Sequence, residues 1–112
     1  VPVPMHPKKI KKRGYNQAEC IALGLQNSTG IVMETGFLQR VKDRGSQTQK
    51  SKFDRWLNAK SVYECGVLEE GVRHVAIIDD VVTTGATIEA CIDAIRSKND
   101  VKVSVFSLGF TQ

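Results

Sequence analysis

The chain has 112 residues, enough for one domain that buries about two-thirds of the surface of its unfolded form. Its apolar share of 41% and charged share of 25% are ordinary for a soluble globular protein. No apolar run approaches the roughly 18 residues of a membrane span, and nothing resembles a signal peptide, so the composition argues against a membrane-spanning or secreted class.

The net charge of +4 is unevenly spread. Basic residues gather at 8–13 and again at 40–55, and either stretch suits phosphate, pyrophosphate or nucleic acid. The three cysteines are odd in number, far apart and without a C-x-x-C pair. They predict reduced thiols in the cytoplasm and no zinc site within this chain.

The first predicted element is a short strand over 1–5, followed by a basic loop over 6–15. A helix is predicted to begin at Asn16, because Glu19 three residues later completes the form of a capping box. The polar run 27–30 ends this helix.

A strand is predicted over 31–38, and residues 39–60 form a long polar excursion with a short helix near 51–57. A further short strand is predicted over 61–64, and a turn over 69–71.

Residues 75–78 are apolar without alternation, which is typical of a strand buried on both faces of a parallel sheet. An amphipathic helix follows, with Cys91 on its apolar face, and 101–108 form a closing strand. Strands that alternate with helices predict an α/β fold with a mainly parallel sheet flanked by helices.

The segment after this strand carries most of the functional signal. It reads Asp79, Asp80, Val81, Val82, Thr83, Thr84, Gly85, Ala86, Thr87. In open α/β sheets, ligands bind at the carboxyl ends of strands, and a glycine-containing turn at a helix start offers free N–H groups to a phosphate. The carboxylates repel phosphate, but they suit sugar hydroxyls and a divalent cation. The pattern therefore favours a ribose 5-phosphate site over the alternative, in which the acids form a turn and the threonines cap a helix.

Residues 75–87 resemble the phosphoribosyl-pyrophosphate (PRPP) binding motif of type I phosphoribosyltransferases at all thirteen positions. The resemblance implies that this segment binds PRPP, together with Mg²⁺.

The stretch over 2–19 resembles the ComF family, which is similar to type I phosphoribosyltransferases and is named for bacterial competence, the uptake of DNA. It carries the family's Pro-Val-Pro-x-His-Pro pattern, a basic run and Arg-Gly-aromatic-Asn-Gln, although methionine stands in place of leucine at position 5. The resemblance implies a loop that meets the pyrophosphate of PRPP, with candidate contacts at Pro4, Met5, His6, Lys8, Lys9 and Arg13. The alternative for the lysines is a solvated face.

A third stretch resembles the loop that folds over bound PRPP in type I enzymes. Its matching residues are Arg40, Gln47, Thr48, Arg55 and Asn58. The chain departs from the family pattern at Arg44 and Ala59, and the alternative is a polar linker.

The opening Val-Pro-Val-Pro lacks an initiating methionine and starts as though within a strand, so a fragment of a longer protein is expected, with all 112 residues in one phosphoribosyltransferase-like domain. ComF-like proteins usually begin with a cysteine-rich zinc ribbon and helices, which this sequence does not show. Nor does it show the small hood that covers the acceptor pocket, so the acceptor is not named.

The function expected from the resemblance is PRPP binding, with displacement of pyrophosphate by a nitrogen nucleophile. The alternative is a non-catalytic protein that binds PRPP or a nucleotide and serves DNA uptake. A cytoplasmic location, a homodimer, weak or no nucleic-acid binding and no membrane contact complete the expectations.

Overall fold

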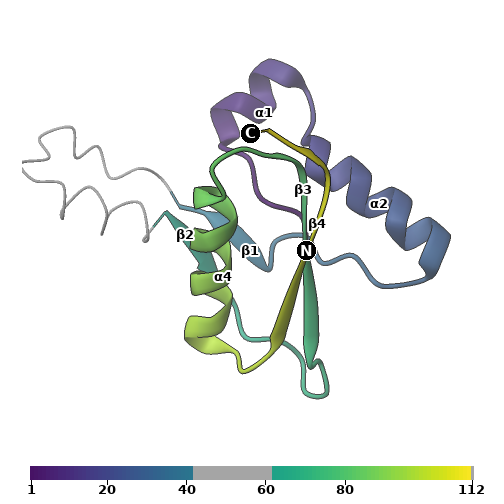
Figure 1. The fold of residues 1–112 in the computed structure, drawn as a ribbon, viewed down its shortest axis with the longest axis vertical. Coiled ribbons are helices and arrows are strands. Elements are labelled where there is room, and N and C mark those ends of the chain that lie inside the picture. Colours follow the sequence, from purple (N-terminus) through teal and green to yellow (C-terminus); the bar gives the residue numbers. More distant parts are fainter. Residues whose placement is uncertain (42–61, 112) are drawn as a thin grey trace, which may run out of the picture.

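The computed structural model describes residues 1–41 and 62–111 (Figure 1). In chain order its elements are α1 (Pro7–Arg13), α2 (Gln17–Thr29), β1 (Leu38–Arg40), β2 (Tyr63–Cys65), β3 (His74–Val82), α4 (Ala86–Lys98) and β4 (Lys102–Phe110). β3 pairs with β4 in parallel, and β1 pairs with β2 in an antiparallel ribbon. The predicted α/β class is confirmed, while the predicted mainly parallel sheet is reduced to one parallel pair beside one antiparallel pair.

β3 forms where the apolar run predicted it, and it continues through both acids to Val82. Its register with β4 runs from His74 opposite Lys102 to Val82 opposite Phe110. The predicted strand over 1–5 is present only as an isolated parallel bridge between Pro2 and Ile78. Two hydrogen bonds of 2.8 Å flank this bridge, from Val3 N to Ile78 O and from Ile78 N to Val1 O. The amino end of the described chain therefore lies along the edge of β3 that faces away from β4.

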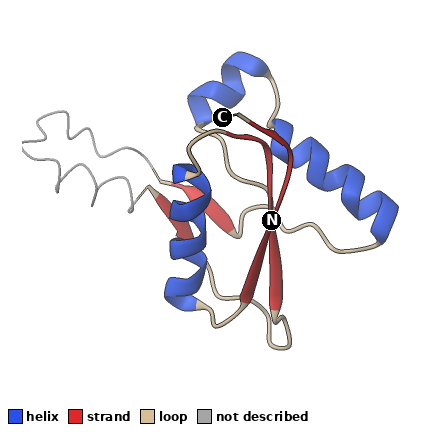
Figure 2. Cartoon of the chain, viewed as in Figure 1, coloured by secondary structure: helices blue, strands red, loops and turns tan. Residues whose placement is uncertain are grey.

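Helices lie on both sides of the β3–β4 pair, with α4 on one side and α2 on the other (Figure 2). α4 turns Ile88, Cys91 and Ile95 inward, and they pack with Ile77 of β3 in the main core cluster. The prediction that Cys91 lies on the apolar face of this helix is confirmed, because its side chain is fully buried in the core. The amphipathic pattern of α4 thus fixes the helix against the strand whose end carries the acids.

α2 begins and ends as the sequence predicts. Asn16 is its N-cap, and the side-chain oxygen of Asn16 accepts a hydrogen bond of 3.0 Å from Ala18 N. Gly30 closes the helix in the left-handed region at φ 77°, where a residue without a Cβ avoids strain.

The predicted basic loop over 6–15 is wrong, because Pro7–Arg13 forms the helix α1. His6 caps this helix by accepting a 3.0 Å hydrogen bond at Nδ1 from Lys8 N, and Pro7 occupies its first turn. Gly14 at φ 96° ends it. The helix is fixed by the capping residues at its two ends. Its only large apolar side chain is Ile10, so an apolar periodicity could not reveal it.

The predicted strand over 31–38 is also wrong except at Leu38, where β1 begins. Gly36 has φ 84°, and Met33 N donates to Gln26 Oε1 at 2.7 Å, so the segment is held by a helix side chain instead of a strand. The strand predicted over 61–64 lies at Tyr63–Cys65. The short helix predicted near 51–57 falls outside the described residues.

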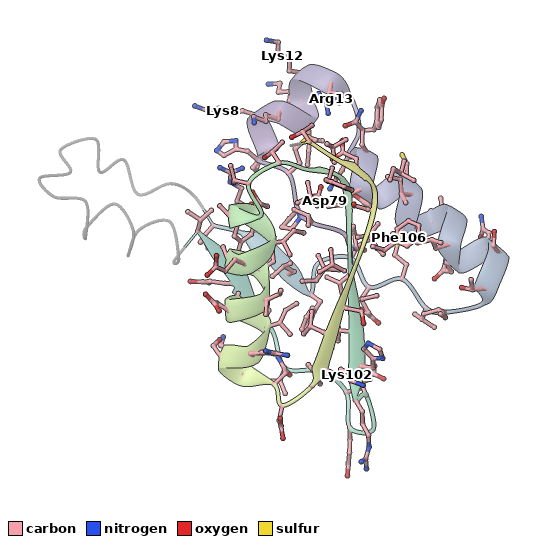
Figure 3. All side chains as sticks on the ribbon, in the orientation of Figure 1. Lys8, Lys12, Arg13, Asp79, Lys102 and Phe106 are labelled. Atoms are coloured by element: carbon pink, nitrogen blue, oxygen red, sulfur yellow. The ribbon has the colours of Figure 1, made fainter. Side chains whose placement is uncertain are left out.

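The α2 side of the β3–β4 pair is only partly covered. An apolar cavity of about 790 Å³ opens there between α2, residues 31–34 and β3, with Phe106 of β4 on its wall (Figure 3). Across residues 1–41 and 62–111, no helix combines the length and apolar character needed to cross a membrane.

Candidate functional site

The turn over 83–85 joins the carboxyl end of β3 to the first residue of α4. Gly85 stands at the N-cap in the left-handed region, at φ 83° and ψ −1°, and as a glycine it offers the helix no side-chain cap of its own. Ala86 N makes a long bond of 3.3 Å to Thr84 Oγ1. The side chains of Thr83, Thr84 and Thr87 are exposed. The predicted strand–turn–helix arrangement is therefore present, and it directs the start of a 13-residue helix toward the strand end.

Asp79 and Asp80 are half-buried in the last part of β3. Asp80 N donates to Asp79 Oδ1 at 2.9 Å, and Val81 N donates to Asp80 Oδ1 at 2.8 Å. Burial raises the pKa of Asp79, and the adjacent Asp80 side chain adds to this rise. Hydroxyl donors or a cation between the two carboxylates would relieve their repulsion, which fits the chemistry predicted for them.

Tyr63 lies near several of these groups, although sequence reasoning missed it. It is buried in β2, where it pairs with Arg40 of β1, and it belongs to the same core cluster as Cys91. Burial raises the pKa of Tyr63 most and the proximity of Cys91 adds to it, whereas Arg40 and hydrogen bonding with Thr87 lower it. Two predicted site residues, Arg40 and Thr87, therefore share one neighbourhood through Tyr63. No motif marks a lone tyrosine in a three-residue strand, so only the fold reveals it.

Some of the predicted pyrophosphate contacts lie in the segment before α1, and the others lie on α1 itself. Pro4 and Met5 line a cavity of about 290 Å³ beneath α1, and Arg40 lines the same cavity from β1. His6 is engaged as the cap of α1, and Arg13 Nη1 donates to Gln17 Oε1 at 2.8 Å. Lys8 and Lys9 are exposed on α1. The structure thus brings Pro4 and Met5 together with Arg40, and it places the lysines on the outside of the helix.

The remaining residues of the predicted covering loop are Gln47, Thr48, Arg55 and Asn58, and all four lie outside the described residues.

Comparison with known proteins supports the ComF resemblance. The chain is 32% identical over 110 residues to Competence protein F of Haemophilus influenzae, across 96% of this chain and 48% of that protein. It is 28% identical over 108 residues to the DNA utilization protein YhgH of Salmonella typhi, across 96% of this chain and 47% of that protein. The chain is also 27% identical over 108 residues to the DNA utilization protein YhgH of Escherichia coli K12, across 96% of this chain and 47% of that protein. The chain spans about half the length of these curated relatives.

No protein-family model and no solved structure matches the chain. The type I phosphoribosyltransferase resemblance therefore depends on the motif residues and their placement at the end of β3.

Proposed function

We propose that this chain is a PRPP-binding domain of the ComF group that is similar to the phosphoribosyltransferases. The observation that carries the proposal is the threonine- and glycine-containing turn between a parallel strand and a 13-residue helix whose N-cap is a glycine, with two carboxylates upstream in the same strand. Such a turn suits the 5′-phosphate, and the carboxylates suit the ribose hydroxyls. PRPP carries the 5′-phosphate and the ribose hydroxyls on the same sugar ring.

Different residues of this chain would bind the different parts of PRPP. Main-chain N–H groups of the turn over 83–87 would hold the 5′-phosphate, and Asp79 and Asp80 would accept hydrogen bonds from the ribose. Pro4–His6, Lys8, Lys9 and Arg13 are the proposed pyrophosphate contacts. Arg40, which lines the same small cavity as Pro4 and Met5, would add a further positive charge there.

Mg²⁺ fits the proposed site as a companion of the ligand. In the described part of the chain, no group of three or more His, Cys, Asp or Glu side chains could hold a metal ion. Mg²⁺ commonly binds through one or two carboxylates together with phosphate oxygens of the substrate, which is what the Asp79–Asp80 pair can offer. The ion would supply positive charge to the pyrophosphate when PRPP is bound.

The proposed reaction is displacement of pyrophosphate from the ribose C1 by a nitrogen nucleophile. Negative charge grows on the departing pyrophosphate, so cations near Lys8–Arg13 would lower the barrier through electrostatic stabilisation. Most of the remaining acceleration would come from positioning. A cytoplasmic location and a homodimer belong to the same proposal, which names no acceptor.

The relatives' names favour a second candidate, in which the domain binds PRPP without turnover and serves DNA uptake or use. Fold and ligand site alone do not imply catalysis. Release of pyrophosphate from PRPP, screened with nucleobases and with ammonia as acceptors, separates the two candidates. Turnover with any acceptor supports the enzyme, whereas saturable PRPP binding without release supports the non-catalytic protein.

Calorimetric titration with Mg-PRPP tests the ligand assignment itself. The double variant Asp79→Asn/Asp80→Asn should bind more weakly by about 1.5–3 kcal/mol for each lost charge-assisted hydrogen bond. The matched control is Glu69→Gln/Glu70→Gln, which removes an adjacent pair of exposed acids from the turn before β3. Unchanged affinity in the Asp79/Asp80 variant, or equal loss in both variants, would remove the ribose assignment.

A further inference from the structure

The strand β4 leaves most of its apolar surface uncovered. None of its nine residues is buried, whereas the neighbouring strand β3 has three buried residues. Within the described residues, α2 and α4 pack on β3, and neither helix packs on β4 to a similar extent. The exposed fractions of Phe106, Leu108 and Phe110 are 40%, 70% and 74%. β4 is therefore the open side of the β3–β4 pair.

These three side chains form an apolar stripe along one face of β4. Successive side chains of a strand point to opposite faces, so Phe106, Leu108 and Phe110 share a face. Phe106 lines the apolar cavity beside α2, which identifies this face as the α2 side. At roughly 200 Å² for each large apolar side chain, the stripe exposes on the order of 350–400 Å². A contiguous apolar patch of this size is often a contact surface.

The free edge of β4 offers main-chain groups to a further strand. Lys102 N donates to Arg73 O at 2.9 Å, so Lys102 turns its main chain toward β3. Alternate residues of a strand turn these groups to opposite edges, so Val105 and Ser107 turn theirs away from β3. In the described part of the chain, β4 pairs with β3 and with no other strand. Residues 103–110 contain neither a charge nor a proline, which are two common means of keeping an edge strand from pairing.

We propose that β4 is the contact surface for a second copy of this chain, whose β4 pairs with it in antiparallel orientation about a two-fold axis at Phe106. Phe106 is the midpoint of β4, so this register pairs the strand along its whole length. Phe106 then meets the partner's Phe106, and the stripes of the two copies join on one face. The inference names an interface for the homodimer in the proposed function, but it uses none of the proposed PRPP contacts.

Charge favours a second copy in this orientation. The charged residue of β4 is Lys102 at its amino end, and antiparallel pairing places it opposite the partner's Phe110. Parallel pairing would bring the two Lys102 side chains together, and like charges on paired strands repel. Figure 3 shows Lys12 of α1 and Lys102 at opposite ends of the molecule. Antiparallel pairing therefore also keeps the basic α1 helices of the two copies at opposite ends of the joined sheet.

The area of the contact predicts a dimer that dissociates on dilution. The joined stripes remove roughly 700–800 Å² of apolar side-chain surface from water, and the paired main chains add to this area. Stable interfaces bury about 1,200–2,000 Å² in total, and transient ones bury less. Sedimentation equilibrium between about 5 and 500 μM should therefore show the mass rise from one chain to two. A mass of one chain throughout this range overturns the proposal.

The variant Val105→Pro tests the pairing of the main chains. Because the Val105 N–H points away from β3, proline there removes a hydrogen bond between the copies and leaves the β3–β4 ladder intact. The matched control is Val105→Ala, which also loses the valine side chain but keeps the N–H. Proline should raise the dissociation constant of the dimer about ten-fold or more relative to alanine, since both copies carry the change. Equal constants for the two variants overturn the strand pairing.

The variant Phe106→Gln tests the apolar stripe without a change to the main chain. It removes the aromatic pair at the two-fold axis, and it should weaken the dimer about ten-fold or more. The matched control is Val32→Gln, which removes an exposed apolar side chain from another wall of the same cavity and should not change the dissociation constant. Equal weakening by both variants would assign the contact to the cavity and overturn the assignment to β4.

Disulfide cross-linking in a Cys20→Ser background, which removes the exposed thiol of α2, tests the register. Phe106 turns its main chain toward β3, so the two copies of residue 106 would form a non-hydrogen-bonded pair with Cα atoms about 4.5 Å apart, within the range of a disulfide. Phe106→Cys should therefore cross-link on oxidation. The two copies of Ser104 would lie about 13 Å apart along the strands, so Ser104→Cys should not cross-link. Cross-linking at Ser104→Cys in preference to Phe106→Cys overturns the axis at Phe106.

A final comparison separates this surface from the PRPP site. The Asp79→Asn/Asp80→Asn variant should dimerise as the unchanged protein does, and Val105→Pro should bind Mg-PRPP with unchanged affinity. A protein that binds Mg-PRPP but stays a single chain at all concentrations would contradict the dimer and leave the ligand assignment intact. A protein that dimerises through β4 but does not bind Mg-PRPP would show that the ligand assignment has failed.

Discussion

The side-chain amide of Asn16 donates a hydrogen bond of 3.1 Å to the carbonyl oxygen of Val3. The same side chain accepts the cap hydrogen bond from Ala18 N, and Asn16 is buried. One residue thereby joins the segment beside β3 to the start of α2. The connection fixes both ends of α1, because the helix and its flanking turns lie between Val3 and Asn16.

The substitution Asn16→Ala should destabilise the protein by about 2–4 kcal/mol, since it removes the helix cap and leaves the buried carbonyl of Val3 without this donor. Asn16→Ser keeps a capping oxygen and should cost less. Urea unfolding of the two variants measures the difference. Equal losses would show that the bond to Val3, and not the cap, carries the whole effect.

Gly85 stands in the left-handed region at the start of α4, and open space surrounds the position of a Cβ there. Gly85→Ala should therefore lower the free energy of unfolding by about 1 kcal/mol through backbone strain alone. The same change should weaken binding of ribose 5-phosphate, because the turn over 83–87 must shift to relieve the strain.

Gly24→Ala is the control for this change. Gly24 lies inside α2 without a positive φ and with equally open space, so alanine there should raise the free energy of unfolding by about 0.5–1 kcal/mol. Ligand binding should not change. Stabilisation by both variants would contradict the conformation assigned to Gly85.

The raised pKa of Asp79 predicts how the free energy of unfolding should vary with pH. Because burial and Asp80 raise the pKa of Asp79 above its unfolded value of 3.8, the folded state holds the Asp79 proton to higher pH than the unfolded chain does. The contribution of Asp79 to the free energy of unfolding is fully present below its pKa in the unfolded chain, and it is lost as pH rises through its pKa in the folded protein. Asp79→Asn should thus be more stable than the unchanged protein near neutral pH, and its stability should vary less with pH.

Urea unfolding over a series from about pH 3 to pH 7 tests this expectation. Asp100→Asn, at an exposed position after α4, serves as the control and should follow the profile of the unchanged protein. Parallel profiles for Asp79→Asn and the unchanged protein would show that Asp79 is not held in a desolvated position.

The strand–turn–helix at the end of β3 and the ends of α2 could be predicted from the sequence, because each depends on local signals. The unalternating run at 75–78 predicts a strand, of which Val75, Ile77 and Ile78 are buried while Ala76 is exposed, so the expected burial on both faces is confirmed only in part. Asn16 and Gly30 mark the two ends of a helix through local backbone chemistry. Both predictions are of this local kind, and the structure confirms both.

The wrong predictions, and the residue that the sequence did not reveal, have physical causes of a different kind. α1 depends on the caps His6 and Gly14 and not on an apolar stripe, so periodicity alone suggested a loop. The segment over 31–37 is rich in strand-forming residues, but Gln26 holds Met33 through a side-chain bond that no local pattern encodes. The proximity of Tyr63 to Thr87 arises from packing between β2 and α4, which are far apart in sequence. Whether the predicted PRPP contacts bind that ligand stays a prediction.

The three free cysteines should differ widely in reactivity. Cys20 is exposed on α2, whereas Cys65 and Cys91 are buried. Burial and then the charge of Asp79 raise the pKa of Cys91 to about 12, and burial raises that of Cys65, whose Sγ lies 3.1 Å from the Ala94 carbonyl oxygen. Since the thiolate is the reactive form, about one Cys91 in ten thousand would be ionised near pH 8 even if it were accessible.

A chromogenic disulfide reagent at mildly alkaline pH should therefore label one thiol quickly, and mass spectrometry should place that label on Cys20. Cys20→Ser should abolish the fast phase, and the other two cysteines should react only at the rate at which the protein opens. Addition of urea should bring all three to the same rate. Rapid labelling of Cys91 in the folded protein would contradict the closed packing of α4 against β3, on which the position of Asp79 and of the turn over 83–85 depends.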